Sequence, residues 1–292
     1  MKLDESSLAS TSSGVMCSTD ITVVQPWCIR DFLIIKRLHS GRNATVFLVK
    51  ELISDEFYVL KRINKENSIT NHETVQVERE INIHGHLVHV NVLRMYAWFH
   101  DVLSVYLVTE YAQLTVSGLL VSKYLGVGFP ECLVQSMVFQ LVAGLSFLHS
   151  HHIIHRDIKP SNLFLVLQKS GGYVLKIGDL GTCVHTIDMR KSVCGTTPYL
   201  APEILSVGGP AGGYSFPVDV WAMGVTMHEM LTTRLPFDGD TPMHIYKRIL
   251  KETYSPPKTA SEDASIFLHA CMQKNPNNRP TAAILSNFSF FN

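Results

Sequence analysis

The densest group of reactive side chains lies at residues 155–162, which read His-Arg-Asp-Ile-Lys-Pro-Ser-Asn. Six fixed residue types in eight places would arise by chance in roughly one chain in a hundred thousand. Apolar residues flank the octet at 153–154 and at 163–166, so the octet is expected to form a tight polar loop between two buried strands. In general a carboxylate can accept a proton, and carboxylate and amide oxygens can bind a cation. A buried polar turn is the structural alternative.

A lysine with an expected acidic partner lies nearer the start of the chain. Lys61 stands in an expected strand, whose period of two places it on the same face as Val59 and Ile63. That face is expected to look into a cleft. A lysine on an apolar face is poorly solvated unless it is paired with a carboxylate. Glu80, on the helix that follows, is the expected partner, and Glu78 is a competitor.

The octet resembles the catalytic loop of the eukaryotic protein kinases. The resemblance implies that Asp157 accepts the proton of the attacking hydroxyl, that Lys159 lies beside the transferring phosphoryl group, and that Asn162 binds Mg²⁺. Residues 179–181, Asp-Leu-Gly, stand where the family has Asp-Phe-Gly. A lone Asp-x-Gly would indicate only a turn, but its place after the octet makes Asp179 the second expected Mg²⁺ ligand.

The same resemblance assigns the ATP contacts, with Lys61 and Glu80 as the pair that positions the phosphates. The phosphate-covering loop is the least typical part, because Gly41 alone remains of three family glycines, and His39 and Ala44 occupy the outer places. Each replacement would cost on the order of 1 kcal/mol if its backbone is strained, which would weaken ATP binding. The expected cofactor-binding residues are Leu38, Gly41, Val46, Val59, Lys61, Glu80, Thr109, Glu110, Ala112, Lys159, Asn162, Leu163 and Asp179.

The stretch after residue 181 corresponds to the kinase activation segment, where three residues are expected to regulate activity. A phosphoryl group on Ser192 would carry about −1.5 to −2 charges, and Arg156 could bind it and order the loop. An exposed serine without a regulatory role is the alternative. Thr196 resembles the threonine that contacts the catalytic aspartate and lysine. The expected scaffold contacts are Glu203 with Arg279, and Asp219 with the catalytic loop from below.

The elements that must position these site residues are expected to form two parts, because the hydrophobic periodicity of the chain changes near residue 130. The expected strands are 32–38, 45–49, 57–63 and 105–111, and the expected helices are 73–87, 132–148, 218–231, 242–250 and 261–272. The predicted fold class is α+β, a two-lobed protein kinase fold with a small antiparallel-sheet lobe, one main helix, and a larger, mostly α-helical lobe. The expected division is a flexible Ser/Thr-rich tail at 1–26, a small lobe at 27–109, a hinge at 110–115 and a large lobe at 116–292.

The amino-acid composition excludes several kinds of protein and of binding partner. Of the 292 residues, 46% are hydrophobic and 17% charged, which excludes wholesale disorder. Equal numbers of basic and acidic residues, 25 each, give no global field for nucleic acid or an anionic membrane. The six cysteines are scattered without metal-ligand spacing and are expected to be reduced thiols. We therefore expect neither direct nucleic-acid binding nor a membrane segment, and a location in the cytoplasm and nucleus.

Several segments look specifically like the Aurora kinases. Lys159 is typical of serine/threonine kinases, so the expected substrates are proteins with Ser or Thr acceptors, and the cofactors are ATP and Mg²⁺. The resemblance implies mitotic roles at centrosome, spindle or chromosomes, and an activating protein on the small lobe. The Aurora-like segments are 27–32, 79–94, 96–101, 105–112, 184–185 and 194–196.

Two alternatives stay open. Within the enzymes, a divergent polo-like or NIMA-related kinase is the nearest rival, since Ser161 stands where Auroras have glutamate. Outside them, a pseudokinase scaffold would keep the fold and bind ATP weakly. The replacement of the outer glycines by His39 and Ala44 is the sequence feature that supports it.

Overall fold

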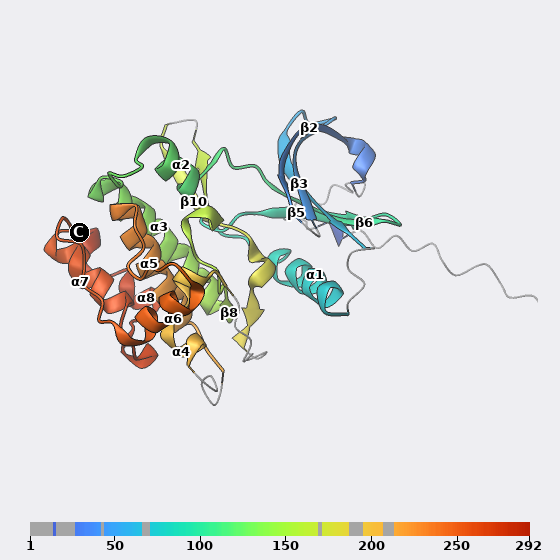
Figure 1. Cartoon of the computed structure of the whole chain (residues 1–292). Coiled ribbons are helices and arrows are strands. Elements are labelled where there is room, and N and C mark those ends of the chain that lie inside the picture. The colour runs from blue at the N-terminus through green and yellow to red at the C-terminus, as the bar shows by residue number, and fades with distance from the viewer. Residues whose placement is uncertain are drawn as a thin grey trace, which may run out of the picture. The chain divides into compact units, whose positions relative to one another are not determined.

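The computed structural model describes residues 14–15, 27–41, 44–65, 71–168, 171–186, 195–206 and 213–292. Ser192, the expected phosphorylation site, lies outside these ranges. The chain divides into two compact units (Figure 1). The small unit comprises Met1–Leu87 and Arg94–Tyr111, and the large unit comprises Val88–Leu93 and Ala112–Asn292.

The small unit is built on a six-stranded antiparallel sheet with the order β1-β5-β6-β4-β3-β2. Its strands are β1 (Gly14–Val15), β2 (Phe32–Ser40), β3 (Ala44–Glu51), β4 (Phe57–Asn64), β5 (Met95–His100) and β6 (Ser104–Glu110). β1 lies within the segment expected to be a flexible tail, and it pairs with the outer side of β5. The sequence therefore predicted four of these strands and missed β1 and β5.

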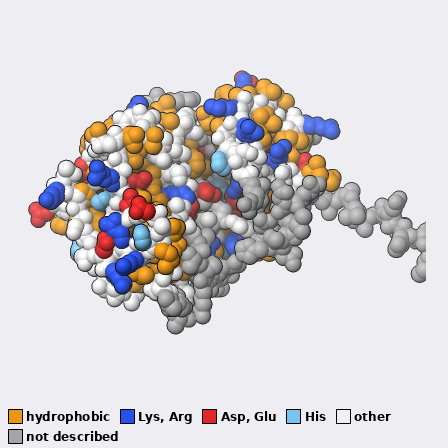
Figure 2. Space-filling view, in the orientation of Figure 1, with side chains coloured by type: hydrophobic (Ala, Val, Ile, Leu, Met, Phe, Trp, Pro, Cys, Tyr) orange, Lys and Arg blue, Asp and Glu red, His pale blue; other side chains and the backbone are white. Residues whose placement is uncertain are grey.

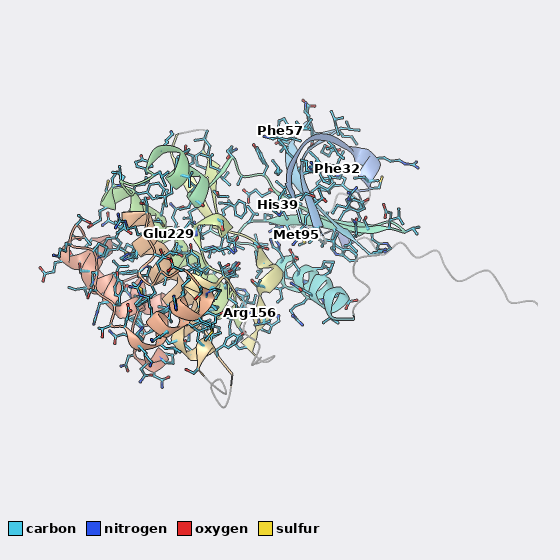
Figure 3. All side chains as sticks on the ribbon, viewed as in Figure 1. Phe32, His39, Phe57, Met95, Arg156 and Glu229 are labelled. Carbon is cyan, nitrogen blue, oxygen red and sulfur yellow. The ribbon has the colours of Figure 1, made fainter. Side chains whose placement is uncertain are left out.

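Two apolar clusters fill the two faces of this sheet. One gathers around Phe32, which stacks on Phe99 with ring centroids 6.2 Å apart. The other contains Met95 and is covered by α1 (Asn71–His84), whose Val77 and Ile81 pack against it. Figure 3 labels Phe32 and Met95 on this sheet. Helix α1 thus lies on one face of the sheet, and a side chain of α1 can reach a side chain of a central strand.

The predicted end of this helix was wrong. The expected helix ran to Leu87, but α1 ends at His84 and Gly85 follows it. Leu87 is buried, with 3% of its surface exposed, and its N–H donates to the carbonyl of His84 in a turn. Its apolar side chain therefore belongs to the core through the turn and not through the helix face.

The large unit is mainly helical, with two small antiparallel sheets of orders β10-β9-β7 and β11-β8. Its helices are α2 (Val116–Lys123), α3 (Glu131–Ser150), α4 (Pro202–Leu205), α5 (Pro217–Thr232), α6 (Pro242–Lys251), α7 (Glu262–Cys271) and α8 (Ala282–Leu285). Its strands are β7 (Leu114–Thr115), β8 (Ile153–Ile154), β9 (Leu163–Leu167), β10 (Tyr173–Ile177) and β11 (Val184–His185). On the face seen in Figure 2, charges of both signs are interspersed. The observed architecture confirms the α+β class.

Helix α3 is the central helix of the large unit and contacts α5, α8 and β10. By length and composition alone it would suit a membrane span, a test that core helices of soluble proteins also pass. Gly144 allows its close approach to β10, because a Cβ there would lie 2.8 Å from Ile177 Cδ1 and 2.9 Å from the Asn91 carbonyl oxygen. The helix is thus fixed against the sheet that carries the candidate site.

Candidate active site

The polar octet forms the loop that the sequence predicts, between β8, which is buried, and β9, of which Leu163 and Leu165 are buried. β8 pairs with β11, and β9 pairs with β10, so both ends of the loop are fixed by antiparallel partners. Pro160–Asn162 form a single 3-10 turn just before β9. The chain therefore enters and leaves the loop through rigid elements, and Asp157 lies at its centre.

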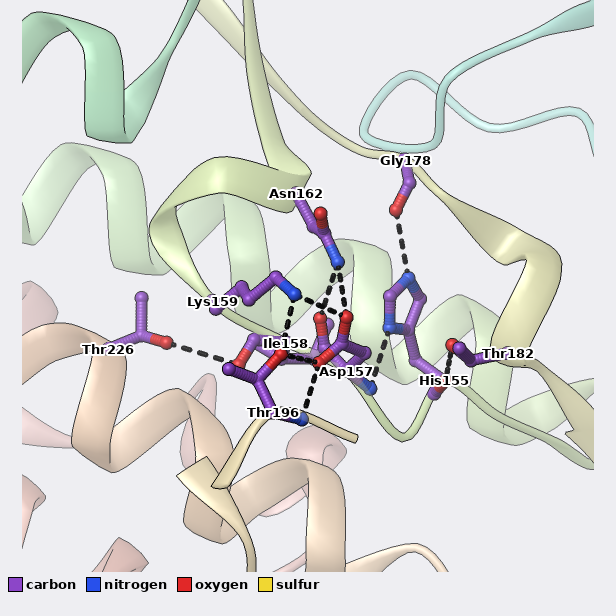
Figure 4. A network of polar contacts seen from close by, with 9 residues as sticks. All are labelled: His155, Asp157, Ile158, Lys159, Asn162, Gly178, Thr182, Thr196 and Thr226. Atoms are coloured by element: carbon purple, nitrogen blue, oxygen red, sulfur yellow. Dashed lines mark hydrogen bonds and ion pairs between the residues drawn. The ribbon is translucent and has the colours of Figure 1, made fainter. Parts of the chain in front are cut away.

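Asp157 is the centre of a network of short hydrogen bonds (Figure 4). Its Oδ2 accepts from Lys159 Nζ at 2.6 Å and from Asn162 Nδ2 at 2.9 Å. Its Oδ1 accepts from the backbone N–H of Thr196 at 3.0 Å and from the Thr196 hydroxyl at 2.7 Å. Lys159 Nζ also donates to that hydroxyl at 2.6 Å. Four residues named from the sequence thus meet within the large unit.

The environment of Asp157 keeps its carboxyl group ionised. Burial raises its pKa, but the hydrogen bonds from Lys159 and Thr196 and the lysine charge outweigh burial, so the pKa lies below its usual value. Only 7% of the surface of Asp157 is exposed. An oriented carboxylate with little water around it is suited to accept a proton from a hydroxyl placed beside it.

Asp219 supports this loop from below, as the resemblance implied. Its side chain is fully buried in the first turn of α5. Its two oxygens accept the backbone N–H groups of His155 at 2.9 Å and Arg156 at 2.8 Å. His149 Nε2 lies 3.0 Å from Oδ2. Burial raises the pKa of Asp219, but the hydrogen bond with His149, the nearby histidines and the His155 N–H together lower it below its usual value. The loop backbone is therefore tied to a helix of the core by an ionised carboxylate.

His149 and Thr182 are site residues that the sequence did not reveal. His149 lies at the end of α3, 70 positions before Asp219, and its only signal in the sequence is a histidine that directly follows an apolar stretch. The Thr182 hydroxyl donates to the carbonyl of His155 at 2.9 Å. The His155 ring bridges two segments, since its Nε2 is 3.0 Å from the Gly178 carbonyl oxygen and its Nδ1 accepts from the Asp157 N–H. These contacts connect the loop to the Asp179 segment.

Arg156 is held inside the large unit. Its φ of 71° is in the left-handed region, which a residue with a side chain adopts only when its surroundings impose it. Its Nε donates to the Thr182 carbonyl at 2.6 Å, and one terminal nitrogen donates to the Tyr214 hydroxyl at 3.0 Å. Gly195 packs against its backbone, with a φ of 116° and a position at which a Cβ would lie 2.6 Å from the Arg156 carbonyl oxygen. Its expected role in phosphate binding stays a prediction, because Ser192 is outside the described residues.

Asn162 and Asp179 fit the chemistry of a magnesium site. Asn162 uses its Nδ2 on both the backbone carbonyl and the carboxylate of Asp157, so its Oδ1 is left as the acceptor of that amide. Asp179 is exposed and adopts a left-handed conformation with φ 57° and ψ 63° just before a 3-10 turn. An amide oxygen and a carboxylate are oxygen ligands of the kind that Mg²⁺ prefers beside substrate phosphates.

Lys61 and Glu80 form the predicted ion pair within the small unit. Lys61 Nζ donates to both Glu80 oxygens, at 2.7 Å and 2.9 Å. The lysine side chain is 26% exposed and the glutamate side chain 8%, so the pair is partly shielded from water. Glu78, the competitor, is exposed on the same helix. The pair fixes the lysine head group of a central strand against α1, and its convergence with Asp179 stays a prediction.

β2 and β3 pair in antiparallel fashion, and the Gly41 N–H donates to the Ala44 carbonyl at 2.8 Å. His39 lies in β2 and pairs with Val46 of β3. Neither His39 nor Ala44 has a positive φ, so neither replacement of an outer glycine is strained in the backbone. The condition under which these replacements would cost about 1 kcal/mol each is therefore not met.

The remaining expected nucleotide contacts occupy regular positions in their own units. Leu38 is exposed on β2, and Val59 of β4 pairs with Thr109 of β6. Glu110 ends β6, where its N–H donates to the Arg94 carbonyl. In the large unit, Leu163 begins β9 and is fully buried, and Ala112 precedes β7. Their contacts with ATP stay predictions.

Glu203 and Arg279 form the predicted scaffold pair of the large unit. The two terminal nitrogens of Arg279 donate to the two oxygens of Glu203, at 2.6 Å and 2.8 Å. Arg279 is buried and also donates to the carbonyls of Gln273 and Pro217. The bidentate geometry fixes α4, which contains Glu203, against the C-terminal part of the unit.

The fold and these contacts define the class, and comparison with known proteins agrees: residues 32–291 match the protein kinase domain, and the chain belongs to this family. Its relatives include an Aurora kinase of Dictyostelium discoideum, 35% identical, with 87% of this chain and 64% of the relative aligned. Aurora kinase A-B of Xenopus laevis is 36% identical, over 87% of this chain and 60% of the relative. Serine/threonine-protein kinase Aurora-2 of Arabidopsis thaliana is 37% identical, over 80% and 79%. The chain thus spans less than two thirds of the length of the first two relatives.

Proposed function

We propose that the chain is an Aurora-like serine/threonine protein kinase that transfers the γ-phosphoryl group of ATP to Ser or Thr hydroxyls of proteins. The single observation that carries this proposal is the buried, ionised Asp157 with Lys159, Asn162 and Thr196 around it. In kinases this aspartate accepts the proton of the substrate hydroxyl. The similarity to Aurora kinases of three organisms supports the narrower assignment.

Each group then has a defined role. Asp157 orients the acceptor hydroxyl and takes its proton, while Lys159 provides a positive charge beside it. Asn162 and Asp179 would hold Mg²⁺, and Lys61, kept in place by Glu80, would bind ATP phosphates. Bound Mg-ATP supplies the phosphoryl group and the cation that neutralises its charge. The chain itself contributes positioning and fixed charges, which are the main means of catalysis in this reaction class.

The biological setting is proposed on the same family basis. Roles in chromosome segregation, spindle assembly and cytokinesis, with an activating protein bound to the small unit, follow from the Aurora similarity. A polo-like or NIMA-related kinase is the alternative among enzymes, and the substrate sequence preference distinguishes these. A pseudokinase scaffold is the alternative outside them, and its support is limited to the residues at the two outer glycine positions.

The test is transfer of labelled phosphate from γ-labelled ATP to a generic basic protein, followed by identification of the labelled amino acid. The wild type is expected to label serine or threonine. Lys61→Met, Asp157→Asn and Asp179→Asn are each expected to lower the rate by at least about a hundredfold, since each removes a group that positions reactants or takes the proton. Lys36→Met, at an exposed lysine of β2, is the matched control and should retain the rate. Equal background labelling by the wild type and all variants would favour the scaffold.

A further inference from the structure

Arg156 carries a buried positive charge whose hydrogen-bond acceptors are neutral. The residue is 9% exposed, and its guanidinium donates to the Thr182 carbonyl at 2.6 Å and to the Tyr214 hydroxyl at 3.0 Å. Within the parts of the chain that the structure describes, this guanidinium forms no ion pair with a carboxylate. A buried charge is costly unless its donors find acceptors. Each of the two acceptors is therefore important for the position of Arg156.

The start of α5 provides two acceptors for Arg156. Asp219, in the first turn of the helix, accepts the backbone N–H of Arg156 at 2.8 Å. Tyr214 lies just before the same helix, and its hydroxyl accepts from the guanidinium of the same arginine. The turn between Tyr214 and the helix is closed by a hydrogen bond from the Val218 N–H to the Ser215 carbonyl at 3.1 Å. The end of one core helix thus holds both the backbone and the side chain of Arg156.

The backbone of Arg156 needs this support. Its φ of 71° lies in the left-handed region, and the surrounding contacts must offset the free energy that this conformation costs a residue with a side chain. Arg156 directly precedes Asp157, so a change in the Arg156 backbone changes the direction in which the Asp157 carboxylate points. That carboxylate accepts hydrogen bonds from Lys159 and Thr196 at 2.6–2.7 Å. A contact that fixes Arg156 therefore also fixes the expected proton acceptor.

The second acceptor, Thr182, is itself bonded to the catalytic loop. Its hydroxyl donates to the His155 carbonyl at 2.9 Å (Figure 4), while its own carbonyl accepts from Arg156 Nε. A guanidinium is planar and rigid, so an acceptor at one of its nitrogens determines where the other N–H groups point. The Tyr214 hydroxyl therefore also orients the Nε donor toward Thr182, and the loop is held from two sides.

We propose that Tyr214 is a positioning residue of the active site, whose hydroxyl holds Arg156 in the conformation that places Asp157 for phosphoryl transfer. This inference rests on the proposed kinase function. Tyr214 is 5% exposed, so it acts through the arginine that it contacts and not by touching a substrate. The hydroxyl is the group that the proposal needs, because a phenylalanine at this position would keep the ring in the core.

Steady-state kinetics of Tyr214→Phe in the full chain, with a generic basic protein as substrate, test the proposal. A hydrogen bond to a charged group changes an equilibrium by roughly tenfold to 150-fold. We therefore expect kcat to fall by at least about tenfold, while the KM for ATP changes by less than about twofold. Tyr254→Phe is the matched control, because Tyr254 is 6% exposed in the same unit and its hydroxyl contacts His228 and not the catalytic loop. This control should keep the kcat of the wild type.

Two further measurements separate positioning from a general loss of structure. In an Arg156→Met background the Tyr214 hydroxyl has no guanidinium to hold, so Tyr214→Phe should lower kcat there by less than about twofold. Hydrogen exchange of the full chain, followed by mass spectrometry, reports on the loop independently of phosphoryl transfer. The amides of residues 155–158 should exchange roughly fivefold faster or more in Tyr214→Phe and at the wild-type rate in Tyr254→Phe.

Three kinetic results would overturn the proposal: an unchanged kcat in Tyr214→Phe, equal losses in Tyr214→Phe and Tyr254→Phe, or full additivity of the losses at Tyr214 and Arg156. If the wild type transfers no phosphate, hydrogen exchange decides. Faster exchange of residues 155–158 in Tyr214→Phe, but not in Tyr254→Phe, would then refute the proposed function and leave the hold of Tyr214 on the loop intact. Unchanged exchange in both variants would refute this inference itself.

Discussion

The contact between Asp219 and the catalytic loop offers a direct test of how the loop is held. In Asp219→Asn, one carboxylate oxygen becomes an NH₂ group, so the N–H of either His155 or Arg156 faces a donor instead of an acceptor. A buried donor without a partner costs about 1–3 kcal/mol, and loss of the charge-assisted bond to His149 adds about 1.5–3 kcal/mol. The two contributions together span about 2.5–6 kcal/mol, and we expect a loss in the middle of that range, about 3–5 kcal/mol, in the free energy of unfolding.

Thermal unfolding followed by circular dichroism measures this loss. For a chain of this size about 1 kcal/mol corresponds to roughly 2 °C, so the midpoint should fall by roughly 6–10 °C at neutral pH. Glu262→Gln is the control, because Glu262 is also an acid in the first turn of a helix, α7, but is exposed. The midpoint of Glu262→Gln should change little, because Glu262, like Asp219, interacts with the dipole of its helix but makes no buried hydrogen bonds of the kind that Asp219 makes.

The pH dependence gives a second measurement on the same variant. The pKa of Asp219 is lowered in the folded protein, so its stabilising contribution is complete above the ordinary aspartate range and is lost as the pH falls through the folded-state pKa. The difference in midpoint between wild type and Asp219→Asn should therefore shrink below about pH 4. A variant within about 1 kcal/mol of the wild type at neutral pH would refute the view that Asp219 holds the loop.

Two further predictions concern the large unit. Burial lowers the pKa of His228 to about 4, and the Nδ1 of this histidine lies 3.0 Å from the Tyr254 hydroxyl. Between about pH 4 and 6.5 the unfolded state therefore binds more protons than the folded state. The free energy of unfolding should rise with pH across this window. His228→Gln should flatten that slope in thermal unfolding, and an unchanged slope would contradict the assignment. Arg279→Leu should cost about 3–5 kcal/mol in urea unfolding, because it leaves the Glu203 carboxylate partly buried without its partner. Addition of Glu203→Leu should recover part of this loss, and strict additivity of the two losses would refute the coupling.

Most strands and helices could be predicted because their hydrophobic period and end signals agree. The helix predicted at 261–272 is α7, with Ser261 as a side-chain cap at its start and Met272 at its end. β5 could not be predicted in this way. Met95, Ala97 and Phe99 point into the core, but the alternate positions are aromatic, so the sequence lacks the change between apolar and polar residues that identifies a half-buried strand.

For the site, the sequence was sufficient where the groups are close along the chain or belong to a recognised pattern. It predicted the contacts of Thr196 with Asp157 and Lys159, and the pairing of Lys61 with Glu80. It could not reveal His149, because a contact across 70 residues depends on the packing of two helices and no local pattern encodes it. Residues that support others through tertiary packing are therefore missed even where the reactive residues are identified.

The hydrogen bonds that the Asp157 carboxylate already accepts limit how a substrate hydroxyl can reach it. A carboxylate offers about four lone-pair sites, and donors of Lys159, Asn162 and Thr196 make four hydrogen bonds to this one. An acceptor hydroxyl must therefore replace one of these donors before Asp157 can take its proton. The Thr196 N–H is part of the backbone, and the Asn162 amide is held by a second bond to the Asp157 carbonyl. The Lys159 side chain is 20% exposed, and its ammonium group keeps its bond to the Thr196 hydroxyl when it leaves Asp157, so we expect this ammonium group to give way.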